Sequence, residues 1–364
     1  MRIVLDGAPL TAKTGGIRRY VEELSTALSR EFPEDEIYAV NDRPMHDPKA
    51  LVRAGTKIRD SAPKGWANRR WWLMGISNLC DSLSATVFHG TDFSVPYLHK
   101  HPAVLTVHDL SPWLRPEWQP SAKRIRQRTP WMMRLGLADE VITVSEAVRT
   151  EIVARFGVPR ERVHAIPLAA DSRFRPIHGH PSQAAEASPP YFLYVGTLEP
   201  RKKLPELISA WLPVYQETGV ALKIAGRRRE DFSFHAEHPG LAWLGAVPDE
   251  ELPGLYSGAL AVVYPSEYEG FGLPVLEAMQ CGAPVVVGPA AALRELVADG
   301  GIVVMPGDAP GFGDVLRRFA TEREFRMKWS ERGLCRAQLY SWNLTAQRTR
   351  VVYQEAIARF ERTA

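Results

Sequence analysis

The amino-acid sequence predicts an α/β protein with two doubly wound domains, each built on a parallel sheet with helices on both faces. Along the whole chain, short apolar and often β-branched runs alternate with segments of helical periodicity. This order is typical of parallel sheets that are buried on both faces. The alternation stops once, in a small, polar, proline-rich stretch near residues 178–190, and then begins again.

Length and composition agree with this class. The 364 residues suit about two domains. With 45% hydrophobic and 24% charged residues, the chain is neither disordered, collagen-like nor a coiled coil. Its apolar runs are far shorter than the roughly 20 residues of a membrane span. A net charge of +3 argues against a general nucleic-acid binder.

Cysteine usage and the start of the chain indicate the compartment. Cys80, Cys281 and Cys335 are far apart, so they give neither a disulfide framework nor a structural zinc site. The first residues carry charges where a signal peptide would be apolar. We therefore expect a cytoplasmic protein.

The first domain is expected to span residues 1–175. Residues 2–5 form its first predicted strand, and the glycine pair Gly15 and Gly16 follows. Tyr20, Leu24 and Leu28 then recur at helical spacing. Three further buried strands are expected at residues 86–88, 103–107 and 140–144.

A linker at residues 176–190 and a second domain at 191–341 are expected to follow. The strands of the second domain are predicted at residues 191–195, 221–225, 242–244, 261–264, 284–287 and 301–304. Residues 342–360 have the pattern of an amphipathic helix. Ligands of such sheets bind at the carboxyl ends of the strands. Two such domains facing each other would form a cleft.

The most informative segment is residues 261–282, AVVYPSEYEGFGLPVLEAMQCG. A strand is followed by a loop with Glu269, Gly270 and Gly272, and then by a predicted helix that carries Glu277. Free N–H groups at a helix N-terminus behind a glycine turn suit a phosphate or diphosphate. Carboxylates are unfavourable beside a phosphate. The two glutamates therefore indicate recognition of hydroxyl groups, such as those of a ribose or a sugar.

This segment resembles the E-x7-E signature of the family 4 retaining glycosyltransferases, which have the GT-B fold. The resemblance covers nearly the whole chain. Residues 195–202, VGTLEPRK, resemble the first turn of that family's donor domain, and Gly15-Gly16-Ile17 resembles its N-terminal glycine loop. The resemblance implies an acceptor-binding first domain and a nucleotide-sugar-binding second domain. It also implies that the C-terminal helix, residues 342–364, crosses back to the first domain.

The resemblance assigns roles to individual residues. Glu277 would bind the nucleotide ribose, and Glu269 would contact the donor sugar near the reacting carbon. Arg201 and Lys202 would neutralise the donor diphosphate, and His108 would lie near the donor sugar. The remaining donor-binding positions that it implies are Gly15, Gly16, Gly196, Gly270, Phe271, Gly272 and Leu273.

The sequence departs from the family pattern at two places. Lys203 stands where asparagine or glycine is common. Residues 167–171, PLAAD, replace a frequent asparagine–glycine turn. Neither change removes a charged group that the chemistry needs.

The reaction implied is transfer of a hexosyl unit to a hydroxyl with retention at the anomeric carbon, in polysaccharide assembly. The run at residues 196–202 looks most like members that use GDP-mannose, with a UDP-sugar as the alternative. The sequence contains no D-x-D motif. We therefore expect no metal site and no cofactor, with Arg201, Lys202 and the helix after Gly272 stabilising the leaving group.

The sequence motifs also allow other interpretations. The same fold carries sugar-nucleotide epimerases, phosphorylases and non-catalytic binding proteins. The run from Gly270 to Gly272 lacks the third glycine of a dinucleotide fingerprint. His89, which ends a predicted strand, suits an acceptor-side or a structural role equally. Residues 227–229, three arginines, are more typical of a solvated loop than of a phosphate site.

Two segments of the first domain interleave cations with aromatic or apolar residues, at 64–73 and 123–135. Basic and tryptophan side chains favour an anionic membrane interface. The resemblance implies a lipid-linked or other saccharide acceptor, because many members of the family act on lipid-linked saccharides. Together with these segments, it leads us to expect a peripheral position on the inner face of the cell membrane. In the alternative interpretation, Trp71, Trp72 and Met132 fill a core or line the acceptor site.

Overall fold

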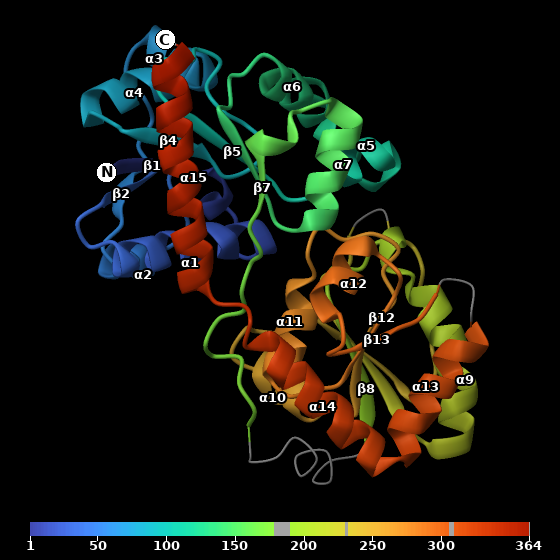
Figure 1. Cartoon of the computed structure of the whole chain (residues 1–364). Coiled ribbons are helices and arrows are strands. Elements are labelled where there is room, and N and C mark those ends of the chain that lie inside the picture. The colour runs from blue at the N-terminus through green and yellow to red at the C-terminus, as the bar shows by residue number, and fades with distance from the viewer. Residues whose placement is uncertain (178–189, 230–231, 306–308, 364) are drawn as a thin grey trace. The chain divides into compact units, whose positions relative to one another are not determined.

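The computed structural model describes residues 1–177, 190–229, 232–305 and 309–363 (Figure 1). The chain divides into two compact units. The first unit contains Met1–Leu168 and Ser341–Ala364, and the second contains Ala169–Tyr340. Most of the linker expected at residues 176–190 lies outside the described residues.

Within the described ranges, the first unit has a seven-stranded parallel sheet in the order β3-β2-β1-β4-β5-β6-β7. Its strands are β1 (Arg2–Asp6), β2 (Glu36–Val40), β3 (Lys57–Arg59), β4 (Val87–Gly90), β5 (Ala103–Val107), β6 (Glu140–Thr143) and β7 (Val163–Ala165). All residues of β4, β5 and β6 are buried. This burial explains their continuous apolar runs.

Helices connect and cover these strands. They are α1 (Gly16–Glu31), α2 (Lys49–Arg53), α3 (Trp66–Arg69), α4 (Ile76–Leu83), α5 (Ser111–Leu114), α6 (Lys123–Arg134), α7 (Glu146–Phe156) and α15 (Trp342–Thr363). A π-helical turn, η2 (Trp71–Gly75), joins α3 to α4. Short 3-10 helices occur at η1 (Ala8–Thr11), η3 (Pro116–Trp118), η4 (Pro120–Ala122) and η5 (Arg160–Arg162).

The second unit repeats the architecture, with a six-stranded parallel sheet in the described residues, in the order β10-β9-β8-β11-β12-β13. Its strands are β8 (Tyr191–Val195), β9 (Ala221–Ala225), β10 (Leu241–Gly245), β11 (Ala261–Tyr264), β12 (Val285–Val287) and β13 (Ile302–Val303). Its helices are η6 (Pro200–Lys202), α9 (Leu204–Thr218), α10 (Leu252–Ser257), α11 (Leu273–Gln280), α12 (Ala291–Val297), α13 (Ala309–Thr321) and α14 (Arg323–Ala337).

The C-terminal helix α15 belongs to the first unit. It packs against α1 and against β4, β5 and β6, and Figure 1 shows it in red beside the blue α1. Tyr353 of α15 is fully buried, and its hydroxyl lies 2.7 Å from Nδ1 of His89 on β4. Arg350 on the same helix pairs with Asp35 at 2.8 Å. Residues more than 200 positions apart thus share one core.

The predicted strands correspond to β1, β4, β5, β6 and β8–β13, with ends that shift by up to two residues. Three strands of the first unit, β2, β3 and β7, were not predicted. β3 and β7 have three residues each and lie at the sheet edges, where partial exposure removes the apolar signal. Among the described residues, none of the helices has the length and apolar character to cross a membrane.

Candidate active site

The candidate site of the second unit lies where β8 adjoins β11. β8 pairs with β9 on one side and β11 on the other, so the strand order reverses there. Such a switch point is the usual ligand position of an open α/β sheet. The loops after β8 and β11 carry Arg201, Lys202 and Glu269.

Glycines let the loops come close together. Gly196, which follows β8, has φ of +156°, and a Cβ there would lie 3.0 Å from the Tyr194 hydroxyl and 3.2 Å from that of Tyr264. Gly226, which follows β9, has φ of +152°, and its Cβ would lie 1.8 Å from the Gly196 carbonyl oxygen. A side chain at Gly226 would therefore force the two strand ends apart.

Arg201 and Lys202 converge on one carboxylate. Lys202 Nζ pairs with Glu269 Oε1, and Arg201 Nη1 lies 3.1 Å from Glu269 Oε2. Lys202 Nζ also donates to the Tyr264 hydroxyl at 2.7 Å, and Arg201 Nη1 donates to the Tyr268 carbonyl at 2.6 Å. The sequence-predicted trio thus forms one ion-pair cluster.

The charged groups of this cluster are buried, so each strongly affects the pKa of its neighbours. Glu269 is 8% exposed and Lys202 is 4% exposed. Desolvation alone would raise the pKa of Glu269, but the charges of Arg201 and Lys202 outweigh it and hold that pKa at about 2. Burial lowers the pKa of Lys202, against the opposing effect of Glu269. The site therefore holds a permanent carboxylate between two cations.

Further groups around the cluster were not singled out from the sequence. Glu199 accepts from Arg201 at 2.7 Å and from Arg229 at 3.1 Å, so Arg229 is not simply a solvated loop residue. Tyr264 and Tyr194 stack with ring centroids 5.5 Å apart. Tyrosines within a buried strand give the sequence signal of core residues, which is why their polar contacts could not be foreseen.

The backbone at Lys203 explains why glycine or asparagine is common at this position. Lys203 has φ of +53°, a left-handed conformation that glycine and asparagine adopt most readily. Its ammonium group lies 3.2 Å from a carboxylate oxygen of Glu267. The backbone of this turn therefore has the conformation that the residues common in the family favour.

Glu277 lies on α11, which begins after Gly272. Gly272 has φ of +110°, and a Cβ there would lie 2.5 Å from a methyl carbon of Leu293. Glu277 is 2% exposed, and Oε2 accepts a hydrogen bond from the Tyr256 hydroxyl at 3.0 Å. Its carboxylate is thus held by a partner other than the cations that hold Glu269.

The other motif residues have different surroundings. Phe271 is buried and meets Tyr340 edge-on at 5.9 Å, which is a packing contact. Gly270 is buried and Leu273 is half-buried, at the start of α11.

His108, Gly15 and Gly16 belong to the first unit. Gly15 precedes α1 with φ of +140°, and Gly16 begins that helix; both are exposed. His108 follows β5, and Nε2 lies 2.8 Å from the Thr91 carbonyl oxygen. Burial lowers the pKa of His108, although the neighbouring Asp92 opposes the shift.

His89 has a structural environment. Its two ring nitrogens lie 2.7 Å from the hydroxyls of Tyr353 and Thr106, respectively, and its exposure is zero. Burial lowers its pKa to about 3. The imidazole is therefore neutral, and both of its nitrogens have hydrogen-bond partners within the core.

The first unit also contains a cavity of about 350 Å³ beside β2, β3 and α4, with both apolar and polar walls. Its walls include the polar side chains of Asn41, Arg59, Ser61, Lys64, Asn68, Asn78 and Ser82. Such groups can donate to and accept from hydroxyls.

Comparison with known proteins identifies the class to which this fold belongs. Residues 179–334 match the family described as "Glycosyl transferases group 1", and residues 14–174 match "Glycosyltransferase Family 4". A solved structure of HepE from Anabaena, in complex with UDP and glucose, has a TM-score of 0.72 at 17% identity and covers 96% of this chain and 98% of its own. The two Rossmann-like units thus form the GT-B fold.

The curated relatives agree in class. The O-antigen chain mannosyltransferase B of Escherichia coli is 35% identical over 95% of this chain and 98% of its own length. The O-antigen chain mannosyltransferase RfbU of Salmonella typhimurium is 27% identical over 73% of this chain and 74% of its own. The chain belongs to the family 4 glycosyltransferases, and it is a glycosyltransferase that uses a nucleotide-sugar donor and a saccharide acceptor. The epimerase and binding-protein alternatives are not favoured.

Proposed function

We propose that this enzyme transfers a mannosyl unit from GDP-mannose to a saccharide acceptor, with retention at the anomeric carbon and without a metal ion, in the assembly of a cell-surface polysaccharide. The donor assignment is supported by the relatives named as mannosyltransferases, one of them similar over nearly the whole chain. The chemistry is supported chiefly by one observation, the buried cluster of Arg201, Lys202 and Glu269 at the β8–β11 switch point.

In this proposal the two cations bind the donor diphosphate. A buried ammonium and a guanidinium beside the departing phosphate stabilise the charge that develops on it, which is the task a divalent ion performs in other enzymes. Glu269 keeps these cations compensated before the donor binds. A buried charge without a partner would otherwise be costly.

The two glutamates have separate tasks. Glu277, held by Tyr256, accepts hydrogen bonds from the ribose hydroxyls. Glu269, between the two cations, contacts the donor sugar near its reacting carbon. Gly196 and the turn of Gly270 and Gly272 let the donor approach the backbone. The glycine loop at Gly15 and Gly16 contacts donor phosphates, and His108 contacts the donor sugar.

Retention requires that the acceptor hydroxyl attack the face that the diphosphate leaves. We propose that the departing phosphate oxygen accepts the proton of the attacking hydroxyl, so that no covalent sugar–enzyme bond forms. The C–O bond to the diphosphate breaks as the new C–O bond forms on the same face. Arg201 and Lys202 then hold the nucleoside diphosphate that is released.

The acceptor is proposed to bind to the first unit. The cavity beside β2 and β3 supports this, because the amide, hydroxyl and cationic groups in its walls suit a saccharide. The role of the cavity can be tested by replacing Asn78 with leucine. The KM for the acceptor should rise, while the affinity for the donor nucleotide should not change.

We propose that a cationic and aromatic surface attaches the enzyme to the inner face of the cell membrane. Trp66 is 69% exposed and Trp131 is 50% exposed, each among exposed arginine or lysine side chains. Trp71 and Met132 are buried, as the alternative interpretation has it. The membrane contact is therefore assigned to Trp66, Trp131 and their basic neighbours.

Two measurements test these proposals. In a thermal-shift screen, GDP-mannose should stabilise the protein more than UDP-glucose does, since a ligand that binds only the folded state stabilises it by mass action. A larger shift with UDP-glucose would overturn the donor assignment.

In liposome sedimentation, anionic vesicles should retain the protein at low salt, and replacing Trp66 and Trp131 with serine should release it. Protein that stays in the supernatant would refute the membrane proposal.

A further inference from the structure

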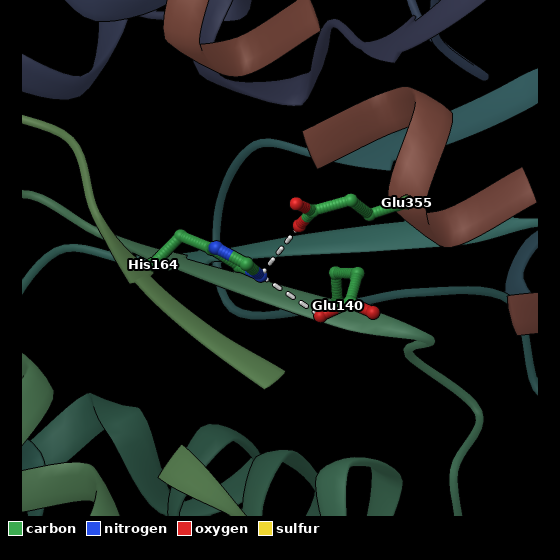
Figure 2. Close-up of side chains that lie close together, drawn as sticks. All are labelled: Glu140, His164 and Glu355. Carbon is green, nitrogen blue, oxygen red and sulfur yellow. Dashed lines mark hydrogen bonds and ion pairs between the residues drawn. The ribbon is translucent and has the colours of Figure 1, made fainter. Parts of the chain in front are cut away.

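Three side chains of the first unit point toward one another on the edge of the sheet formed by β6 and β7 (Figure 2). Glu140 begins β6, His164 lies at the centre of β7, and Glu355 comes from α15. His164 Nε2 is 2.9 Å from Glu140 Oε2 and 3.3 Å from Glu355 Oε2. The three atoms all lie within 4.8 Å of one another.

This cluster is separate from the residues assigned to glycosyl transfer. Glu140 occupies the amino end of β6, whereas His108 follows the carboxyl end of the neighbouring β5. A parallel sheet presents these ends at opposite edges. The cluster therefore needs an explanation of its own.

Its atoms form a set of metal ligands. One imidazole nitrogen and two carboxylate oxygens are ligands that zinc accepts, and a catalytic or open zinc site often has three protein ligands with water as the fourth. Zinc–ligand bonds of about 2.1 Å at tetrahedral angles separate neighbouring ligand atoms by roughly 3.4 Å. The distances from His164 Nε2 to Oε2 of Glu140 and to Oε2 of Glu355, 2.9 and 3.3 Å, are within about half an ångström of this value.

The surroundings would hold the ligands in place. Arg359, one helical turn after Glu355, donates from Nε to Oε1 of Glu140 at 2.6 Å and leaves Oε2 directed at His164. Ligating carboxylates are commonly oriented in this way by a second hydrogen bond. Solvent reaches the cluster, because the Glu355 side chain is 49% exposed and that of His164 is 22% exposed.

We propose that Glu140, His164 and Glu355 bind a divalent metal ion of the zinc class, which links the C-terminal helix α15 to β6 and β7. The ion would be coordinated by Nε2 of the neutral imidazole, whose one N–H proton would then be on Nδ1. Its role is to stabilise the docking of α15 and does not depend on the proposed transfer reaction. The site would make the stability of the first unit responsive to zinc.

The test uses the full chain, freed of metal with a chelator and desalted. Zinc chloride is titrated into the wild type and into three variants, and the heat of binding is measured. Glu355→Gln and His164→Gln each remove one ligand, and Glu361→Gln is the matched control, an exposed acid on the same helix. The melting temperature of each protein is recorded with and without zinc.

We expect one zinc ion per wild-type chain, and at least roughly tenfold weaker binding in each ligand variant. The control should bind as the wild type does. Zinc should raise the melting temperature of the wild type and of Glu361→Gln but not of Glu355→Gln. If all four proteins bind zinc equally or none binds it, the proposal is wrong, and the cluster is only a hydrogen-bonded bridge.

Discussion

Glu269 has two tasks in this account, which compete for the same side chain. It compensates Arg201 and Lys202 in the buried cluster, and it contacts the donor sugar near the reacting carbon. When a diphosphate arrives, these cations gain a second anionic partner. Replacement of Glu269 should therefore affect stability and turnover in different ways.

The stability of the protein should depend on Glu269 in a defined pH range. The pKa of Glu269 is about 2 in the folded protein, against an ordinary value of 4.5. The ionised carboxylate thus contributes stability that is complete above about pH 4.5 and is lost as the pH falls toward 2. Glu269→Gln should cost about 3 kcal/mol near neutral pH, as expected for a broken buried pair, and the difference from wild type should narrow in acid. Urea unfolding at a series of pH values measures this difference. A difference independent of pH would contradict the charge assignment.

Turnover should also fall when Glu269 is replaced. Glu269→Gln should lower kcat and kcat/KM together, because an interaction made in the transition state is lost. Its affinity for the nucleoside diphosphate should not fall. Glu267→Gln is the matched control, since Glu267 is a neighbouring acid that pairs with Lys203. A rise in the donor KM alone would make Glu269 a binding residue only.

Glu277→Gln should weaken nucleotide binding about ten- to a hundredfold, since hydrogen bonds to a charged group are worth about 1.5–3 kcal/mol. Tyr256→Phe, which removes only the hydroxyl that supports Glu277, should have a smaller effect. Calorimetry with GDP measures both. Unchanged affinity in a folded Glu277→Gln protein would remove the ribose assignment.

The charged residues of the candidate site could be predicted from the sequence, but not all their partners could. Arg201, Lys202 and Glu269 follow strands that a parallel sheet brings together, so their proximity could be expected. Tyr264 and Glu199 could not be assigned, because a strand tyrosine and a loop acid carry no signal of their own. The sequence showed that Lys203 departs from the family pattern, but it did not show the left-handed backbone at this position.

The helix α11 begins after a residue with an unusual backbone angle. Gly272 precedes it with φ of +110°, a conformation that L-residues rarely adopt. The turn therefore fixes where the N-terminus of α11 points. Any substitution there should disturb the end of the helix that we propose to bind the donor.

Gly272→Ala should destabilise the second unit by about 1–3 kcal/mol through backbone strain and contact with Leu293, and it should weaken nucleotide binding. Gly254→Ala is the control. Gly254 lies in α10, and a Cβ there would meet nothing within 4 Å, so this change should be neutral or slightly stabilising. Thermal unfolding with and without GDP compares the two variants. Equal melting temperatures would contradict the role of the turn.

Burial on both faces made many strands predictable, although β2 is also almost wholly buried and was not predicted. The apolar runs of β5, β8 and β11 leave little doubt about a strand. β3 and β7 are short edge strands with charged residues or a histidine, and their pairing is decided by the neighbouring strand. Helical periodicity alone does not say which sheet α15 covers. The expectation that it returns to the first domain came from the family resemblance, and its individual contacts are seen only in the structure.

In the proposed reaction of the whole molecule, protein cations stabilise the leaving group. Activity should then persist in excess EDTA, whereas Arg201→Ala and Lys202→Ala should each slow transfer sharply. Loss of the zinc ion proposed for the first unit should lower the melting temperature but not stop transfer. Strict dependence of turnover on magnesium or manganese would contradict the claim.

The most direct test is a product analysis. The enzyme is incubated with GDP-mannose and a mannose-containing oligosaccharide in EDTA, and the anomeric configuration of the new linkage is determined by NMR. We expect release of GDP and formation of an α-mannosidic linkage, the configuration of the donor. A β-linked product, or transfer only when a divalent metal is added, would contradict it.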